Sequence, residues 1–520
     1  MGTLRRRLVG ALIALAVVTL AVAGIVPGSQ PLAAQESAAV RPDRWMGDLA
    51  PYLQNKKLTD IVIPGTHDSA AYWLDENGPM LPGHLPDAIA DLYNEYRVGG
   101  QFMARFALAQ SRTIKEQLED GIRYLDIRLA KHNGEIYVHH GLVGHRADVI
   151  FGDIEEFVKA AGREKEIVIL SVSFLGNTPD ADVQSYRQAI LDRFTGRVVP
   201  LTRQWSNTEG WRNDPIPPIG DLWNAGQQVV FLGPPKTGEV EPGLWIDSPW
   251  PNKWREQELE TAVAENLRNG PSDQIYNYGG TPPLLKVGLD AQDRLFVLQA
   301  HPTPDAMLIG LNLVDPFYVI AQCFNFNCIA SLEALAKGVG KRMLDKVFDW
   351  WLVNHINARA NLNIVIADFY EHTSLVQSAL NFNQPFGITP AVSKVFGRTG
   401  ELLKVPLAIV NPTGVEYFVR ASEGHGLVAK MFGSGSPYWE WSHMFGDAAT
   451  SPGNYTVTLT ATTTQGNPTV LGTATIDVSR VAPPANGTVI LWPAMGYQAP
   501  TGTAPQTFSY GSHAAAASAP

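Results

Sequence analysis

The stretch IVIPGTHDSA (Ile61–Ala70) places a short apolar run directly before four polar side chains. The apolar run is typical of a buried strand, and Pro64 and Gly65 indicate a break after it. Barrel and sheet enzymes keep their working groups in turns at the carboxyl ends of strands. The stretch therefore predicts a strand whose end carries chemistry, with His67 and Asp68 as candidate residues.

Similar apolar runs recur along the chain and alternate with helical stretches over about 350 residues. Between the runs, 113–120 predicts a helix, because Thr113 and Glu116 have capping-box spacing and Gly121 follows. A second helix is predicted over 339–360. This alternation indicates an α/β unit, either a parallel barrel or a parallel sheet. The runs that predict strands are DIVIP (60–64), IRYLDIRL (122–129), EIYVHH (135–140), EIVILSVSF (166–174), QVVFLG (228–233), LFVLQA (295–300) and NIVIADF (363–369).

The alternation of side chains along 122–129 predicts which of them face inward. Asp126 and Arg128 share one face of this strand, and its leucine and second isoleucine side chains share the other. In a barrel the Leu/Ile face packs on the surrounding helices, so Asp126 and Arg128 would point inward near the carboxyl end. The next run ends in the same way, with His140 on one face and His139 on the other.

Each of these polar residues also has a plainer explanation. A single histidine after a strand is more often structural than catalytic, and an Asp-x-Arg sequence is more often an internal ion pair. Two histidines, two aspartates and an arginine at the ends of three consecutive strands, with inward parity, favour a functional site.

The amino-terminal segment has the form of an export signal. Three arginines (5–7) precede an apolar run (8–26), and AVA (21–23) and LAA (32–34) are suitable signal-peptidase sites. An uncleaved anchor is the alternative, since such a run can just span a bilayer. We therefore expect residues 1–35 to be a signal peptide or an anchor, and the protein to be exported.

Composition and charge narrow the class of protein. The length of 520 residues fits two or three domains, and the net charge of −10 with a pI of about 5.7 excludes an electrostatic footprint for nucleic acid. The only two cysteines, Cys323 and Cys328, are compatible with a small-loop disulfide in an exported protein.

From about Thr399 the pattern becomes all-β. Runs rich in Thr and Val, such as NYTVTLTATTT and LGTATIDVS, predict antiparallel strands. The stretch WSHMFGDAATSPGNYTVTLTA resembles an immunoglobulin-like or PKD-type sandwich. We therefore expect the α/β unit over 41–397, a small all-β immunoglobulin-like sandwich over 399–480, and a disordered tail rich in Ala, Pro and Gly over 481–520.

The motifs PGTHDS, TIKEQL, DGIRYLDIRL, YVHHG and EIVILSVS, in this order, closely resemble the X domain of phosphatidylinositol-specific phospholipase C. The likeness is strong over 58–173 and continues more loosely to about Glu371. There LWIDSPWPNKW, LFVLQAHPTPD and IVIADFYEH are most similar to the X-domain-only branch of this family. The resemblance implies a distorted TIM-type (β/α) barrel, which agrees with the alternation of strands and helices.

The resemblance also implies a role for each candidate. His67 would be the base for the inositol 2-hydroxyl, and His140 the acid for the departing diacylglycerol oxygen, leaving a cyclic inositol phosphate. Each imidazole needs a carboxylate to fix its tautomer. The likeness pairs Asp368 with His67 and Asp68 with His140, and Asp126 completes the polar floor of the site.

The residue at position 128 indicates whether the protein needs a metal cofactor. Calcium-dependent relatives carry acidic ligands on this strand and an Asn after the first catalytic His, whereas this chain has Arg128 and Asp68, as in the metal-independent bacterial enzymes. A guanidinium can neutralise the phosphate as a fixed cation, and it would repel a divalent ion. We therefore predict no metal and no other cofactor.

Head-group recognition departs from the bacterial pattern. Bacterial relatives have a Lys where this chain has Ser173 and an Arg near Pro234. Asp247 is a candidate for contacts with sugar hydroxyls, and Trp250 for a ring or membrane contact, a core role being the alternative for Trp250. The substrate predicted is therefore phosphatidylinositol, a glycosylated form of it, or another phosphodiester.

The sequence thus predicts an exported monomeric phosphodiesterase that acts on an inositol phospholipid at a membrane surface. A metal-using glycerophosphodiesterase or sphingomyelinase D is an alternative, but it would need acidic ligands around the first histidine, and Arg128 argues against it. The other alternative is a non-catalytic binding protein on a degenerate barrel. Such a protein would have no need of two carboxylate-backed imidazoles.

Overall fold

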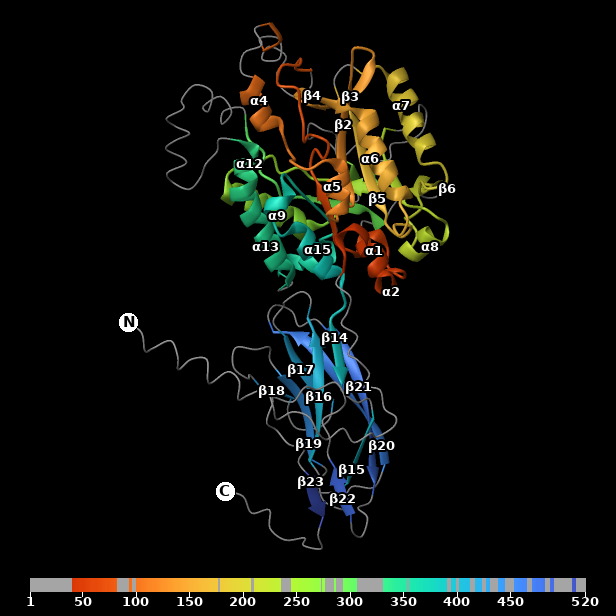
Figure 1. Ribbon diagram of the computed structural model, residues 1–520, viewed down its shortest axis with the longest axis vertical. Coiled ribbons are helices and arrows are strands. Elements are labelled where there is room, and N and C mark those ends of the chain that lie inside the picture. The colour runs from red at the N-terminus through yellow and green to blue at the C-terminus, as the bar shows by residue number, and fades with distance from the viewer. Residues whose placement is uncertain are drawn as a thin grey trace, which may run out of the picture.

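The computed structural model comprises an α/β unit and, joined to it, a β-sandwich (Figure 1). It describes residues 40–510 except for 82–92, 96–99, 176–177, 207–209, 235–244, 273, 276–284, 287–292, 306–330, 353–354, 391–393, 399–401, 412–416, 423–426, 431–437, 445–452, 465–469, 482–486 and 491–506. The segment 1–35 and both cysteines therefore lie outside the described residues. Within the described part, no helix is long and apolar enough to cross a membrane.

A nine-stranded sheet organises the α/β unit. Its parallel strands follow the order β8 (Val229–Leu232), β5 (Val168–Phe174), β2 (Tyr124–His132), β1 (Ile63–Thr66), β13 (Ile364–Ala367), β12 (Leu295–Gln299) and β9 (Ile246–Asp247). The antiparallel strands β3 (Glu135–His140) and β4 (Leu142–Arg146) extend the sheet from the second half of β2. All seven predicted strands are thus confirmed.

Helices border this sheet, and Figure 1 shows α5 and α6 against it. The predicted helix at 113–120 is confirmed as α5, where Thr113 and Glu116 form the capping box. The α-helices within the described residues of the unit are α1 (Trp45–Asp48), α2 (Ala50–Leu53), α4 (Gly100–Ala107), α5 (Ile114–Glu119), α6 (Ala147–Lys159), α7 (Asp180–Arg193), α8 (Ile219–Asn224), α9 (Glu256–Asn269), α12 (Leu332–Leu335), α13 (Lys341–Leu352), α14 (Ala358–Asn361) and α15 (Leu375–Asn383).

The two faces of the sheet bury two separate cores. Leu125, Ile127 and Leu129 of β2 pack with side chains of α5 and α6, as the parity of the strand predicts. The opposite face contributes a second cluster, in which Tyr124 and apolar residues of β1, β5, β8, β12 and β13 pack together with α1 and α2. Since strands from both ends of the order share this cluster, the sheet curves around it. Among the described residues β8 and β9 are not paired, so closure into a barrel stays a prediction.

Strand β1 runs through Pro64 and Gly65 rather than ending before them, which corrects the expected break. The carbonyl oxygen of Pro64 accepts from the N–H of Arg123, just before β2 begins at Tyr124. Proline has no N–H to donate, but Pro64 lies where the pairing of β1 with β2 starts. No hydrogen bond between the two strands is therefore lost there. Gly65 allows β2 to approach closely, because a Cβ at this position would lie 2.9 Å from the Cβ of Tyr124.

The sandwich consists of two four-stranded sheets around a core that includes the buried Trp441. Its first strands, β14 and β15, precede the predicted boundary at 399. One sheet has the order β14 (Gly387–Pro390), β16 (Leu402–Val410), β19 (Tyr438–Met444), β18 (Leu427–Lys430); the other has β15 (Lys394–Arg398), β21 (Val470–Val481), β20 (Gly453–Thr463), β17 (Tyr417–Ala421).

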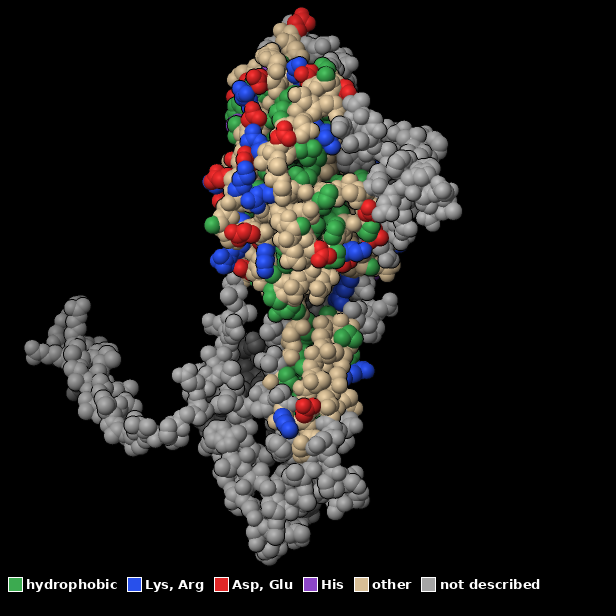
Figure 2. All heavy atoms as spheres, turned by 90° about the vertical axis from the view of Figure 1, so that its right-hand side faces the viewer, with side chains coloured by type: hydrophobic (Ala, Val, Ile, Leu, Met, Phe, Trp, Pro, Cys, Tyr) green, Lys and Arg blue, Asp and Glu red, His purple; other side chains and the backbone are tan. Residues whose placement is uncertain are grey.

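Three short strand pairs complete the description. In the segment predicted to be a disordered tail, β22 (Gly487–Ile490) pairs with β23 (Thr507–Tyr510). The other two pairs lie in the α/β unit: β6 (Arg203–Ser206) with β7 (Gly210–Asn213), and β10 (Gln274–Ile275) with β11 (Leu285–Lys286). On the face of the α/β unit that Figure 2 presents, acidic and basic side chains are interspersed.

A buried ion pair ties the amino-terminal helices to the sheet. Arg123 donates from Nη2 to Oε2 of Glu166 at 2.6 Å, and both side chains are 0% exposed. Arg123 also donates to the carbonyl oxygens of Leu118 and Pro42, and Glu166 accepts from the N–H of Gly47. The pair therefore joins β2 and the start of β5 to the end of α5 and to the segment around α1.

We expect Arg123→Met to lower the free energy of unfolding by about 3–5 kcal/mol, because it leaves the Glu166 carboxylate buried without its cation. Chemical denaturation followed by circular dichroism measures the change. The control is Arg146→Met, whose partner Glu135 is 2.9 Å away but half exposed, and which should cost less than about 1 kcal/mol. Equal effects of the two substitutions would contradict this account.

Candidate active site

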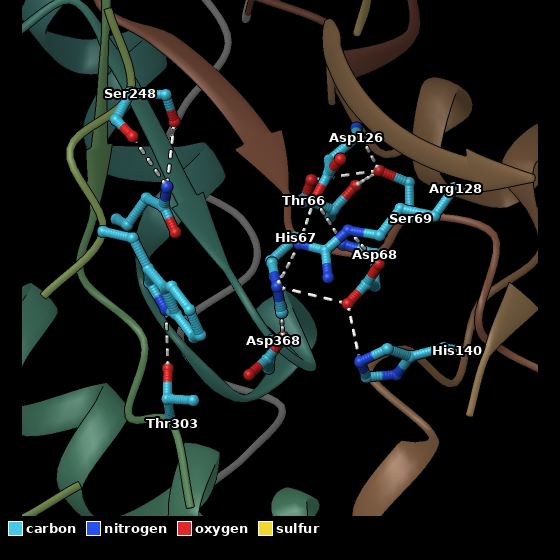
Figure 3. A network of polar contacts seen from close by, with 12 residues as sticks. Thr66, His67, Asp68, Ser69, Asp126, Arg128, His140, Ser248, Thr303 and Asp368 are labelled. Atoms are coloured by element: carbon cyan, nitrogen blue, oxygen red, sulfur yellow. Dashed lines mark hydrogen bonds and ion pairs between the residues drawn. The ribbon is translucent and has the colours of Figure 1, made fainter. Parts of the chain in front are cut away.

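Four neighbouring strands bring the predicted polar residues together, three through their carboxyl ends and β2 through its first half rather than the carboxyl end that the sequence predicted (Figure 3). His67 and Asp68 follow β1, and Asp368 follows β13. Asp126 and Arg128 lie on β2, and His140 is the last residue of β3. Because β1 lies between β2 and β13 in the sheet, His67 sits between Arg128 and Asp368.

His67 is held by a carboxylate at one ring nitrogen and by a guanidinium at the other. Its Nδ1 lies 2.8 Å from Oδ1 of Asp368, and both side chains are buried. Its Nε2 lies 2.9 Å from Nη2 of Arg128. A guanidinium can only donate, so Nε2 accepts and the proton of a neutral His67 sits on Nδ1. This is the tautomer that a general base requires at Nε2.

The Arg128 guanidinium also joins two carboxylates. Its Nε lies 2.8 Å from Oδ1 of Asp68, and its Nη2 donates to Oδ2 of Asp126 at 3.1 Å. The Asp126 carboxylate in turn accepts from the N–H of Asp68 at 3.2 Å. The side chain of Arg128 is 26% exposed, so this cation is fixed by its partners and still accessible to an anion.

His140 faces an acceptor at each ring nitrogen. Its Nδ1 contacts the carbonyl oxygen of Ala107, and its Nε2 lies 2.9 Å from Oδ2 of Asp68. A carbonyl and an ionised carboxylate can only accept, so each ring nitrogen of His140 is placed to act as a donor. The two histidines therefore differ in their surroundings: Nε2 of His67 contacts a donor, Nη2 of Arg128, as well as Oδ2 of Asp68 at 3.2 Å, whereas both ring nitrogens of His140 face acceptors.

The charges of the cluster shift the pKa values of Asp68, His67 and Asp368. Burial raises the pKa of Asp68, but Arg128, His140 and His67 outweigh burial and hold that pKa well below its ordinary value. Burial lowers the pKa of His67, but the carboxylates of Asp68 and Asp368 outweigh burial, so that the pKa is raised. Burial raises the pKa of Asp368, which His67 only partly offsets. The carboxylates thus stabilise the charged form that His67 reaches after accepting a proton.

Neutral side chains that the sequence analysis did not single out fix the loop after β1. Ser69 Oγ accepts from the N–H of Asp126 at 2.8 Å, and its own N–H donates to the carbonyl oxygen of Asp126 at 2.7 Å. Gln110 donates from Nε2 to the carbonyl oxygens of His67 and Ala367 at 2.8 and 3.0 Å. Gln117 donates to the carbonyl oxygen of Ser69 at 2.7 Å. These bonds hold the β1 and β13 strand ends at a fixed separation.

Two residues of this region have left-handed backbone conformations. Asp68 has a φ of 39° and Phe369, directly after Asp368, has a φ of 43°. Such conformations are costly for residues other than glycine, and they cluster at functional sites where the surrounding structure enforces them. The N–H of Phe369 donates to the carbonyl oxygen of Ala109 at 2.8 Å, which holds the turn.

The three residues predicted to bind the head group lie on opposite sides of β1 in the sheet order: Ser173 is on β5, Asp247 is on β9, and Trp250 follows β9. Ser173 is exposed and is the cross-strand partner of Arg128, so it adjoins the cluster on β5. Asp247 lies on β9, where its Oδ2 accepts from the N–H of Ser272 at 2.7 Å. Trp250 is 49% exposed and donates to Oγ1 of Thr303, which excludes the core role considered for it.

Two further histidines are buried near the cluster. His139 points to the other face of β3, and burial lowers its pKa to about 4. His301, two residues after β12, stacks on His67 with ring centroids 3.9 Å apart and an interplanar angle of 18°. The sequence analysis did not select His301. Its position directly beyond a strand end is the signal that could have found it.

Two groups of described residues have ligand atoms close enough to hold a metal ion: His67 with His301 and Asp368, and His67 with Asp68 and Asp126. In the second group the guanidinium of Arg128 already contacts all three members. In the first group the rings are nearly parallel, so their in-plane lone pairs do not converge on one point. Neither donor set therefore fits a divalent ion well.

Comparisons with known proteins bear on the family. No protein-family model matches the chain. The PI-PLC X domain-containing protein 2 of Homo sapiens is 29% identical over 259 residues, covering 48% of this chain and 80% of that protein. The variant-surface-glycoprotein phospholipase C of Trypanosoma cruzi is 25% identical over 346 residues, covering 63% of this chain and 80% of that protein.

Among solved structures, a mutant of the phosphatidylinositol-specific phospholipase C from Staphylococcus aureus matches with a TM-score of 0.39 and 15% identity, covering 63% of this chain and 90% of that chain. These relatives confirm the predicted resemblance to the PI-PLC X-domain family.

We expect Asp368→Asn to lower the pKa of His67, because it removes a carboxylate that stabilises the imidazolium. In the wild type the pKa of His67 should lie above the ordinary value for histidine. A reaction that needs neutral His67 speeds up as the pH rises through this pKa, so the substitution should move the rising limb of the rate profile to lower pH. NMR titration of the ring protons measures the pKa directly.

The control for this titration is Asp345→Asn, which removes a carboxylate that pairs with Lys341 on α13. It should leave the titration of His67 unchanged. An unaltered pKa in Asp368→Asn would show that Asp368 does not act on His67.

Proposed function

We propose that the protein is a metal-independent phosphodiesterase of the phosphatidylinositol phospholipase C type, which cleaves an inositol phospholipid or a related phosphodiester. The surroundings of the two histidines carry the proposal, because Nε2 of His67 contacts a donor on Arg128 while both nitrogens of His140 face acceptors, and intramolecular cleavage of such a diester needs one base and one acid. The family relationship supports it, since one relative is by name a phospholipase C. An amino-terminal export signal would bring the enzyme to membrane lipids outside the cell.

The reaction begins with the exchange of a hydrogen bond. The substrate phosphate accepts from the guanidinium of Arg128, whose Nη2 then releases Nε2 of His67. The 2-hydroxyl of the inositol ring takes that place and gives its proton to Nε2. Asp368 holds the opposite nitrogen and stabilises the imidazolium that forms. Phosphate binding thus makes the base available.

The 2-hydroxyl oxygen then attacks the adjacent phosphorus, and the bond from phosphorus to the glycerol oxygen breaks. Arg128 neutralises the negative charge that develops on the phosphoryl oxygens. His140 supplies the proton for the departing oxygen through Nε2, the nitrogen that faces Asp68 and, beyond it, His67. The products are diacylglycerol and a cyclic inositol phosphate, so the proton taken by one histidine is balanced by the proton given by the other.

Two alternatives are less well supported by the contacts of the site. A metal-using glycerophosphodiesterase or sphingomyelinase D would need convergent ligands, and Arg128 occupies the carboxylates around His67. A binding protein would need no strained loop to hold two histidines against carboxylates. The exact head group stays open, because Ser173 adjoins Arg128 where bacterial relatives carry a lysine.

We expect the purified protein to convert phosphatidylinositol to diacylglycerol and a cyclic inositol phosphate in excess chelator. His67→Ala and His140→Ala should each remove nearly all turnover, since each removes one half of the proton transfer. Phosphorus NMR of the products measures both outcomes. Loss of turnover with chelator would contradict the absence of a metal. An inert wild type on a panel of phosphodiesters would favour a binding protein.

Arg128→Lys should lower kcat by about 100- to 1000-fold, the usual cost of removing a donor aimed at developing charge. A lysine keeps the positive charge but cannot contact Asp68, Asp126 and the phosphate at once through a planar fork. Steady-state kinetics on phosphatidylinositol measure the loss. Arg146→Lys, on the exposed end of β4, is the matched control, and equal rates for the two variants would contradict this role of Arg128.

A further inference from the structure

His301 is a buried histidine that the proposed reaction does not use. It follows β12, the strand next to β13, and its exposed fraction is 3%. Its ring stacks on that of His67, and one of its nitrogens lies within 4.8 Å of a nitrogen of His67 and a carboxylate oxygen of Asp368. His301 is therefore part of the wall against which a substrate at His67 would lie.

Neither ring nitrogen of His301 has a hydrogen-bond partner in the described part of the chain. Burying such a group without a partner costs about 1–3 kcal/mol, so it is rarely retained without a reason. Burial and the neighbouring His67 and Arg128 also lower the pKa of His301 well below its ordinary value. The ring is thus neutral, with one nitrogen as a donor and the other as an acceptor, a combination that fits a hydroxyl group.

The geometry of the substrate indicates which hydroxyl this is. The attacking 2-hydroxyl must approach Nε2 of His67, and the phosphate occupies carbon 1 on one side of it. The neighbour on the other side is the 3-hydroxyl. The ring of His301 is displaced from that of His67 by one stacking distance, so a group next to the attacking hydroxyl lies within its reach.

We propose that His301 is a specificity-determining residue whose neutral imidazole binds the ring hydroxyl next to the attacking one, the 3-hydroxyl of an inositol head group. This inference rests on the proposed function and names the part of the substrate that His301 binds. It gives the site a polar contact on the side opposite to Ser173. A buried hydrogen-bonding group of this kind rejects a substrate that lacks the matching hydroxyl.

The test compares phosphatidylinositol with its 3-deoxy analogue in the wild type and in His301→Phe. Phenylalanine keeps a planar ring that can stack on His67 but has no nitrogen. The wild type should prefer the natural substrate by about 10- to 100-fold in kcat/KM, and the variant should show a ratio near one. The loss on the natural substrate should fall mainly on KM, because the contact is the same before and during the reaction.

Two further variants keep the test decisive if the phenylalanine disturbs the fold. Asparagine and glutamine place a polar group near the positions of Nδ1 and Nε2, so His301→Asn or His301→Gln should restore part of the discrimination and identify the nitrogen involved. The matched control is His355→Phe, on the exposed turn His355–Asn357 that precedes α14, which should leave the ratio unchanged. A wild-type ratio in His301→Phe would overturn the proposal.

A binding measurement separates this inference from the proposed function. The ring resonances of His301, followed by NMR, should shift with myo-inositol and not with 3-deoxy-myo-inositol. If the wild type cleaves no phosphodiester but these shifts occur, the proposed reaction fails and the assignment of His301 stands. If the wild type cleaves phosphatidylinositol with no effect of the 3-hydroxyl on rate or resonance, the assignment fails and the reaction stands.

Discussion

The carboxylate of Asp68 is the contact on which the polar cluster depends. One of its oxygens lies 2.8 Å from Nε of Arg128, and the other lies 2.9 Å from Nε2 of His140 and 3.2 Å from Nε2 of His67. A buried carboxylate without such partners would be neutral or strongly destabilising. Here it stays ionised, which gives Nε2 of His140 an acceptor and fixes the arginine in front of His67. The surroundings of both histidines thus depend on one buried charge.

The frame around this charge explains how it can be kept so close to its partners. Apolar side chains fill both faces of the sheet, so that β1, β2 and β13 cannot shift independently. The left-handed backbone conformations at Asp68 and Phe369 are costly, and the packed sheet offsets this cost. These conformations place two carboxylates against the histidines. Rigid strands with strained ends are a common way of presenting catalytic groups at a fixed separation.

Much of this arrangement could be predicted from the sequence because it rests on local patterns. Apolar runs located the strands, the parity of 122–129 located Asp126 and Arg128, and the family motifs suggested which carboxylate lies near which histidine. What escaped prediction depends on contacts between distant segments. His301 follows a predicted strand but lies in a Pro-rich stretch with no periodicity, so its stacking on His67 could not be predicted. Likewise the continuation of β1 through Pro64 depends on where β2 begins.

The pairing of β1 with β13 has a consequence for how the protein matures. His67 and Asp368 are 301 positions apart in the chain, yet their side chains touch. Contacts between such distant segments form late, after the intervening strands and helices have found their places. The first histidine therefore lacks its carboxylate until the last strand of the α/β unit docks beside β1. A chain still emerging or half folded lacks the complete polar cluster, so any reactivity that depends on this cluster is acquired only with the finished fold.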